Sequence, residues 1–388
     1  MHFEFLPNEI LIECFQYLNA PDIFHSFDQL NSRFSKLLRN IPLHLNFQRF
    51  KTNLFYEFCQ IILSNPEIKQ NIISLRLSND GRCGQIKSFL SLISLNEFIH
   101  LRSLSFIDFN RHNTEQLLPI LPFLSNLYYF SFTFADDKSL KIIPILFQFK
   151  IRILTIPTFN SYLRSIDKTM SGTSLTISEI HLLPLYKLLE YVPMLKYLQI
   201  KDFDDSDTED DTSNLIHRNA VYLKTFIVDY SNVEFHIFEF LLKCFPNLKT
   251  FSIMNSDEIE MIDANRWQYL IESSLPYLHT FKFNFLDYSH TCYDEKVIKL
   301  QLFQTDFWTK QHQWYIDFEI DCFSAAVYTI PTIDDLLLIL KKCSKLSMIK
   351  LDIINQKIYS WIQTNASMLN VYITFTRISG NDDDDDDD

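Results

Sequence analysis

The chain has 388 residues, of which 47% are hydrophobic and 15% aromatic, and this is enough apolar material for one large or two ordinary folded domains. Its formal net charge of −13 comes from two acidic runs, residues 202–211 (six Asp and one Glu) and 382–388 (seven Asp), so that the rest is nearly neutral. This balance excludes a large basic field for nucleic acid and a basic amphipathic helix for a membrane surface.

The apolar stretches are short, such as residues 336–340, whereas a membrane span needs roughly 20 residues. Residues 1–4 lack the charged start of a secretory signal. The seven cysteines are scattered and form no C-x-x-C pair, which favours reduced thiols over a disulfide framework or a zinc site. We therefore expect an intracellular protein, cytoplasmic or nuclear, that does not bind a membrane.

The first stretch with a clear pattern predicts a helix that begins near Pro7. Proline suits the first turn of a helix, and Glu9 places a negative charge near the positive end of the helix dipole. Apolar residues then recur at three- and four-residue steps over residues 10–18, which lines one face of a helix.

Two more short helices are expected before residue 40. Residues 20–22 open the second, and Asn31 or Ser32 can cap the third, which carries Phe34. A unit this small rarely has a core that is stable alone. Its apolar surface must therefore be covered by a partner or by the following domain.

The sequence L-P-x-E-I-L, followed by F-x-Y-L, D-I and N-S-R-F over residues 6–34, resembles the F-box. In that family the segment docks on the Skp adaptor subunit of cullin-RING ubiquitin ligases. Ser32 and Phe34 depart from the family, where a basic residue and Trp are common, and a generic helical cap on a larger domain is the alternative. The resemblance implies a Skp-type adaptor, and through it a cullin, as partners. It implies these adaptor-binding residues: Leu6, Pro7, Ile10, Leu11, Phe15 and Leu18.

A second domain is expected to follow an F-box of residues 1–45. Residues 41–47 alternate apolar with polar and indicate a strand, and residues 47–63 return to helical spacing. Beyond them one short pattern recurs. It consists of an apolar residue, two variable residues, a second apolar residue, one variable residue and a third apolar residue. The middle residues of the ten copies are Leu75, Leu104, Phe130, Leu154, Ile180, Leu198, Phe226, Phe251, Phe281 and Ile349.

The first nine copies lie 18 to 30 residues apart, which is typical of leucine-rich repeats, and residues 314–318 could form a divergent copy before the tenth. The last three positions of each copy alternate as a strand does, and helix-like segments lie between copies. Those segments are residues 85–98, 178–191, 234–244 and 333–343.

The whole chain thus resembles a divergent F-box/leucine-rich-repeat protein. This implies an α/β fold in which a three-helix F-box is followed by a solenoid over residues 46–380, with parallel strands on its concave face and helices outside. The asparagine that such repeats place after the strand is mostly missing, Asn255 being one candidate. A doubly wound α/β domain is the alternative, and the recurrence of the whole pattern favours the repeats.

The acidic runs are expected to be disordered, as an insertion at residues 202–213 and a tail at residues 381–388. A calcium loop would need spaced ligands and a turning glycine, which both runs lack.

No catalytic motif was found. Residues 81–84 contain two of the four glycines but neither the spacing nor the lysine of a phosphate-binding loop, and H-E-x-x-H and G-x-S-x-G are absent. The nearest cluster of metal-ligand types, His279, His290 and Cys292, lacks partners at regular spacing. We therefore expect no enzyme, with no catalytic residue, no cofactor and no metal.

A target protein is expected to bind the concave face, where side chains between the buried apolar ones reach solvent. The candidate target-binding residues are Arg76, Tyr129, His181, Lys201, Lys282 and Lys350. The lysines are interpreted as an ordinary solvated face, and an anionic or phosphorylated target is the alternative hypothesis.

The leading interpretation is a substrate-recognition subunit of an SCF-type E3 ubiquitin ligase, which binds a target protein and no nucleic acid. The alternatives are a leucine-rich-repeat interaction scaffold without ubiquitin ligation, and an α/β enzyme with a deep pocket of converging titratable groups.

Overall fold

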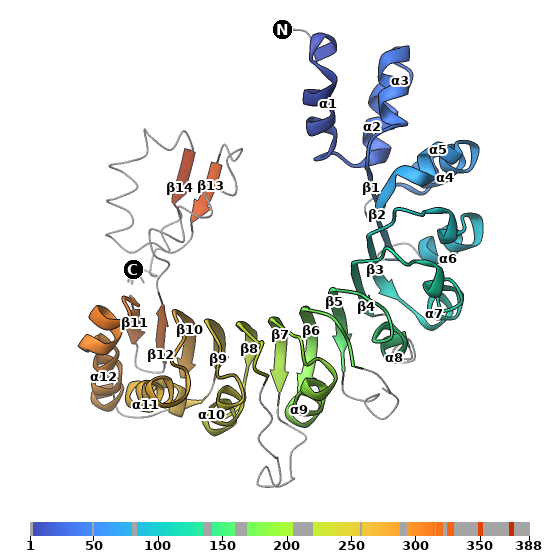
Figure 1. Ribbon diagram of the computed structural model, residues 1–388. Helices are drawn as coiled ribbons and strands as arrows, with labels where there is room; N and C mark the ends of the chain where they lie inside the picture. Colours follow the sequence, from blue (N-terminus) through green and yellow to red (C-terminus); the bar gives the residue numbers. More distant parts are fainter. Residues whose placement is uncertain are drawn as a thin grey trace, which may run out of the picture. The chain divides into compact units, whose positions relative to one another are not determined.

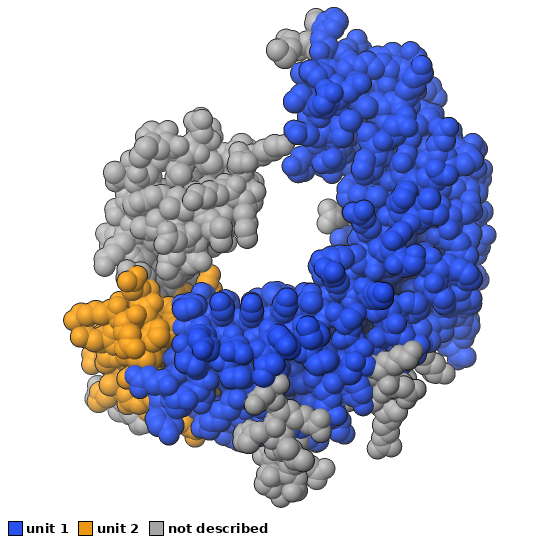
Figure 2. Space-filling view, in the orientation of Figure 1, with its two compact units in different colours: residues 1–258, 269–280 blue, residues 259–268, 281–388 orange. Residues whose placement is uncertain are grey.

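A computed structural model describes the chain at residues 3–48, 50–79, 84–134, 142–159, 169–204, 220–256, 258–287, 293–314, 316–320, 324–329, 348–351 and 372–375. The fold is mixed α/β, with a mostly parallel twelve-stranded sheet in the order β1 to β10, then β12 and β11. The chain divides into two compact units (Figure 2). Unit 1 holds residues 1–258 and 269–280, and unit 2 holds residues 259–268 and 281–388.

Unit 1 begins with a 3-10 turn and three helices: η1 (Phe3–Phe5), α1 (Asn8–Phe15), α2 (Ala20–Phe27) and α3 (Ser32–Leu38). Pro21 lies in the first turn of α2, as expected. The side chain of Asn31 accepts hydrogen bonds from the backbone N–H groups of Arg33 and Phe34 and so caps α3. The three helices predicted from apolar spacing and capping residues are therefore present.

Nine parallel strands follow in unit 1: β1 (Leu43–Asn46), β2 (Ile72–Ser78), β3 (Ser103–Phe109), β4 (Tyr129–Phe134), β5 (Ile153–Thr158), β6 (Ser174–His181), β7 (Tyr197–Asp204), β8 (Thr225–Ser231) and β9 (Thr250–Ser256). Each pairs with the next strand in the sequence. The expected strand over residues 41–47 is β1, which pairs with β2 and so crosses the expected domain boundary at residue 45.

Helices connect these strands and lie along one face of the sheet (Figure 1). They are α4 (Thr52–Ser64), α5 (Pro66–Asn71), α6 (Gln85–Leu92), η2 (Leu95–Glu97), α7 (Arg111–Leu117), η3 (Leu121–Phe123), α8 (Ile143–Leu146), α9 (Leu182–Tyr191) and α10 (Phe235–Lys243). Helix α11 (Ala264–Ser274) contributes residues to both units.

The core of unit 1 is built in rows that cross the sheet. Side chains at equal register on neighbouring strands point to the same face, because side chains alternate along each strand. Phe226 and Phe251 are at equal register and stack at 5.5 Å, while Phe106 meets its diagonal neighbour Phe130 edge to face at 6.0 Å. The large number of phenylalanines is thus used to fill the space between sheet and helices.

The structure corrects the predicted register of the fifth copy. Leu175 pairs with Leu198 and Ile177 with Ile200, so Leu175 takes the middle position that was assigned to Ile180. The segment expected to be helical from residue 178 continues as β6 to His181, and α9 begins only at Leu182. The spacing of apolar residues in this segment is compatible with either Leu175 or Ile180 as the middle residue. Only the pairing with β7 distinguishes the two alternatives.

The acidic insertion was also placed too early. Residues 202–204 complete β7, and the side chain of Phe203 is fully buried. The remainder of the insertion and the tail at residues 381–388 lie outside the described residues.

Unit 2 contains η7 (Ile259–Ile262), most of β10 (Thr280–Asp287), α12 (Tyr293–Gln301), η8 (Leu302–Gln304), a π-helical turn η9 (Phe307–Gln311), β11 (Ile316–Ile320), β12 (Ala325–Thr329), β13 (Met348–Leu351) and β14 (Tyr372–Phe375). Trp267, Phe281, Phe283, Phe285 and Trp308 are buried there. Both β10 and β11 pair antiparallel with β12.

Two predictions for this unit are therefore wrong. The divergent copy at residues 314–318 overlaps an antiparallel strand, β11, and the tenth copy lies in a separate two-stranded sheet, β13 with β14. The helix expected at residues 333–343 lies outside the described residues.

Candidate functional site

The three N-terminal helices share a small aromatic core. The ring of Phe15 lies 5.1 Å from Phe27 and 6.4 Å from Phe34, and Phe27 and Phe34 are 5.5 Å apart. Leu11 is 0% exposed and Phe15 is 1% exposed, so α1 uses one narrow face for packing. Helices of seven or eight residues are marginal alone, and this shared core is what stabilises them.

Arg33 ties the start of the chain to the third helix. Its guanidinium donates to the carbonyl oxygens of Leu6 at 2.5 Å and Glu4 at 2.6 Å, and to Oδ1 of Asn8 at 2.9 Å. A planar guanidinium can reach three acceptors in fixed directions, which a lysine cannot do. The L-P-x-E and N-S-R-F segments, 25 to 29 residues apart, are thus held as one structure.

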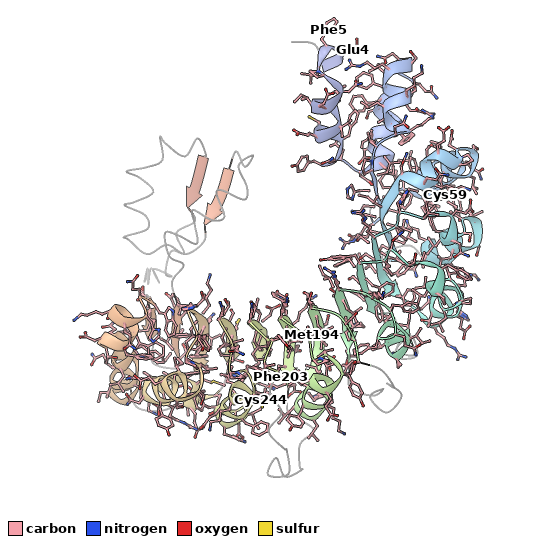
Figure 3. All side chains as sticks on the ribbon, viewed as in Figure 1. Glu4, Phe5, Cys59, Met194, Phe203 and Cys244 are labelled. Atoms are coloured by element: carbon pink, nitrogen blue, oxygen red, sulfur yellow. The ribbon has the colours of Figure 1, made fainter. Side chains whose placement is uncertain are left out.

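Several large apolar side chains of the helical unit face solvent. Phe5 is 78% exposed, Tyr17 75% and Ile10 43%. Figure 3 shows Phe5 and Glu4 at the tip of the helical unit. We call the following residues the apolar set: Phe5, Ile10, Tyr17, Leu18 and Leu30. Exposed apolar groups gathered on so small a unit are typical of a protein-binding surface.

The structure separates the predicted adaptor-binding residues into two groups. Pro7, Ile10 and Leu18 are exposed and Leu6 is half-buried, so a partner can reach them. Leu11 and Phe15 are buried between the helices and support the surface from beneath. Sequence reasoning missed Phe5, Tyr17 and Leu30 as surface residues. For Tyr17 the available signal was its position outside the apolar stripe of the first helix, whereas Leu30 fits the spacing of the second helix and gave no such signal.

The helical unit is firmly attached to the sheet of unit 1. Asn19 and Asn46 exchange two hydrogen bonds of 2.8 Å, the first from the Asn19 side chain to the Asn46 carbonyl and the second from the Asn46 N–H to Asn19 Oδ1. Phe24 of α2 meets Phe58 of α4 edge to face at 5.6 Å. Arg39 forms an ion pair with Asp28 at 2.5 Å, and this pairing raises the pKa of the Arg39 guanidinium.

A groove of about 380 Å³ lies at this attachment, between α2 and α4. Its lining includes Phe24, Leu54 and Phe58 with three acidic groups, Asp22, Asp28 and Glu57, and His25. Asp28 is already paired with Arg39. We therefore interpret the groove as a gap in the packing where the helical unit meets α4, and not as a ligand site.

A second candidate surface is the face of the sheet opposite the helices. Register aligns one outward row across it: Asn46, Arg76, Ser105, Ser131, Thr155, Thr176, Gln199, Ile227 and Ser252. Arg76 is exposed in this row, and Tyr129 lies in the adjacent row between Ser103 and Ile153. Lys201 is exposed farther along β7.

Of the other predicted target-binding residues, His181 and Lys350 do not join this row. His181 ends β6, and its Nδ1 lies 3.1 Å from the carbonyl oxygen of Asp204, while Thr176 takes the row position. Lys282 is an exposed residue of β10 in unit 2. Lys350 belongs to β13, in the separate two-stranded sheet of that unit.

The outward face near Lys201 also carries a negative group. Tyr197 donates its hydroxyl to Gln199 Oε1 at 2.9 Å, and Gln199 Nε2 donates to both carboxylate oxygens of Asp229, at 3.1 and 2.9 Å. Burial, with the charge of Asp229, raises the pKa of Tyr197. This face is thus mostly uncharged, with one carboxylate that offsets the nearby lysine.

Comparison with known proteins adds no assignment: no family model matches the chain, and no curated protein matches it significantly. Across the described segments, no helix is both long and apolar enough to cross a bilayer. The same segments contain no cluster of three or more His, Cys, Asp and Glu side chains arranged to bind a metal ion.

Proposed function

We propose that this chain is the substrate-recognition subunit of an SCF-type E3 ubiquitin ligase, in which the N-terminal helices dock on a Skp-type adaptor and the rest binds a target protein. The observation that carries the proposal is the exposed apolar set of the helical unit. Arg33 holds the Leu6–Pro7 loop of this unit in place, and the helices' own core leaves the apolar set exposed. A rigid apolar surface of this kind costs little ordering entropy on binding.

A divergent leucine-rich-repeat solenoid is proposed for the sheet that follows. Its support is the sequential order of parallel strands with helices on one face, whereas a doubly wound sheet reverses its strand order at a switch point. Two buried asparagines lie four residues after Leu75 and Phe251: Asn79 directly follows β2, and Asn255 is next to the last residue of β9. Asn79 donates to the carbonyl of Asp108 at 3.0 Å, and Asn255 donates to the carbonyl of Val233 at 3.0 Å. Such bonds fix the turn after a strand.

Ubiquitin transfer requires no chemistry from such a subunit, which acts by holding its target close to the ubiquitin-bearing enzyme. A surface for the adaptor and a surface for the target are sufficient for this role.

The test is affinity purification of the full chain from cells, with quantification of the co-purified adaptor and cullin. The double variant Ile10→Glu/Tyr17→Glu places two charges within the apolar set and should reduce adaptor capture about tenfold or more. The matched control, Ile298→Glu/Tyr269→Glu, changes exposed residues of the same two types in α12 and α11 and should bind as the unmodified chain does.

Adaptor capture that survives the Ile10/Tyr17 change in a folded protein would overturn the docking surface. Capture of the adaptor without a cullin would instead favour a scaffold that takes no part in ubiquitin ligation. Circular dichroism of each variant establishes that the fold is retained.

A further inference from the structure

A row of positive side chains follows the edge of the sheet at which the strands of unit 1 begin. The residue before each strand is hydrogen-bonded through its backbone to the equivalent residue of the neighbouring strand. Lys224 N–H donates to the Lys196 carbonyl at 2.9 Å, and Lys249 N–H donates to the Lys224 carbonyl at 2.9 Å. We call this row, together with Lys150, the basic edge. From β3 to β9 the row consists of Arg102, Tyr128, Arg152, Thr173, Lys196, Lys224 and Lys249.

The cations of the basic edge are exposed and available. All five in the row, and Lys150 beside it, are solvent-exposed. The guanidinium of Arg152 lies over the ring of Tyr128, 5.8 Å from its centroid. Within the described parts of the chain, none of these six cations forms an ion pair.

Carboxylates are missing from the segments that form this edge. The segments leading into the strands contain no Asp or Glu: residues 98–102, 124–128, 148–152, 169–173, 192–196, 220–224, 245–249 and 275–279. Glu97 precedes the first of them and is paired with Lys69 at 2.6 Å. Glu190 and Glu272 lie on the preceding helices α9 and α11. The positive charge is therefore concentrated along the edge itself.

Apolar side chains are interspersed with these cations. Met194 and Tyr222 are exposed two residues before Lys196 and Lys224, respectively. Figure 3 shows Met194 at the start of β7, with the buried Phe203 at its other end. A ligand for this edge would therefore carry negative groups with apolar groups between them.

We propose that the basic edge binds an extended segment of a partner protein, rich in Asp and Glu and with apolar side chains between them. Neighbouring strands are about 4.8 Å apart, so the six steps from Arg102 to Lys249 span about 29 Å, the length of about nine extended residues. A protein segment is favoured over nucleic acid because exposed apolar side chains, Met194 and Tyr222, lie among the cations, whereas a nucleic-acid backbone presents a phosphate at every unit.

This inference is independent of the adaptor surface, since the basic edge lies on the sheet and its test needs only the purified chain. It differs from the sequence-based expectation of an anionic target at Lys201, Lys282 and Lys350, which lie on other parts of the fold. The cations that do align were not recognised, because they are separated by 20 to 50 residues and become neighbours only through strand register.

The experiment measures binding of fluorescent nonapeptides to the full chain by anisotropy. One peptide alternates Asp or Glu with Leu, and its partner peptide has Asn or Gln in place of every acid. We expect the acidic peptide to bind at least about tenfold more tightly than the amide peptide, and to weaken as salt is raised.

Two sets of variants locate the site. Lys196→Glu/Lys224→Glu/Lys249→Glu should weaken the acidic peptide by about tenfold or more, and the same three changes to Gln should give a smaller loss. The matched control, Lys51→Glu/Lys87→Glu/Lys187→Glu, reverses three exposed lysines outside the row and should bind as the unmodified chain does.

Three results would overturn the proposal. The first is no binding of the acidic peptide, or equal binding of the acidic and amide peptides. The second is a loss in the control as large as that in the Lys196 triple variant, which would show a general charge effect. The third is tighter binding of single-stranded oligothymidine than of the acidic peptide, which would assign the edge to nucleic acid.

Discussion

The N-terminal helical unit and the parallel sheet of unit 1 are stabilised in different ways. The helices are seven or eight residues long and depend on a few contacts distant in sequence, among them the Phe15–Phe27–Phe34 cluster and the bonds of Arg33. The sheet instead repeats one backbone register from β1 to β9, so that its stability is spread over many equivalent contacts. The packing of the helical unit leaves apolar side chains exposed for a partner, whereas the regular register of the sheet leaves a long row of aligned strand ends.

The largest expected effect comes from removing one buried ring in each region. Phe34→Ala and Phe130→Ala each empty a fully buried position and should each cost about 3–5 kcal/mol. Hydrogen exchange with mass spectrometry should show that the Phe34 change increases exchange within residues 3–38, whereas the Phe130 change increases it across the neighbouring strands. Increased exchange over the whole sheet in the Phe34 variant would mean that the helical unit is a cooperative part of the sheet.

A smaller effect is expected from Arg33→Lys, which keeps the charge but removes the planar group that reaches three acceptors. The loss should be about 1–3 kcal/mol, concentrated in the Leu6–Pro7 loop. This loss of stability is measured by hydrogen exchange of residues 4–8 and by the affinity for the proposed adaptor. Arg111→Lys on α7, where the arginine pairs with Glu115 at an exposed site, is the control and should change stability by less than about 0.5 kcal/mol. Equal effects of the two changes would remove the structural role assigned to Arg33.

The same contrast explains what could be predicted from the sequence. Helix starts were found because capping and apolar spacing act over three or four residues, as at Asn31. Most strands were found because the pattern alternates locally. The register of β6 and the antiparallel direction of β11 depend on the neighbouring strand, and a local pattern contains no information about that strand.

The candidate sites follow the same rule. The region of the helical surface was predicted from a motif, but its division into buried Leu11 and Phe15 and exposed Ile10 and Leu18 depends on how three helices pack. The basic edge was not predicted at all, since no window of about 18 residues, the length used to detect periodicity, contains more than two of its cations.

The smallest expected effect is a pH dependence at the joint between the two regions. His44 lies on β1, and its burial lowers the pKa of its imidazole below the usual 6.5. The unfolded chain therefore takes up a proton first as the pH falls below 6.5. The stability due to neutral His44 is complete above that pH and is lost as the pH falls toward the folded value.

Denaturant unfolding followed from pH 7 downward should show a shallower loss of stability in His44→Gln than in the unmodified chain. The exposed His100, changed to Gln, is the control and should leave the slope as it is.

Because β1 connects the helices to β2, the same unfolding experiment also compares the two regions. If hydrogen exchange of β2 to β9 and of α1–α3 shifts together with His44 protonation, the joint couples the two regions. If only the helices respond, the sheet is stable without them, and the apolar set can unfold separately from the sheet.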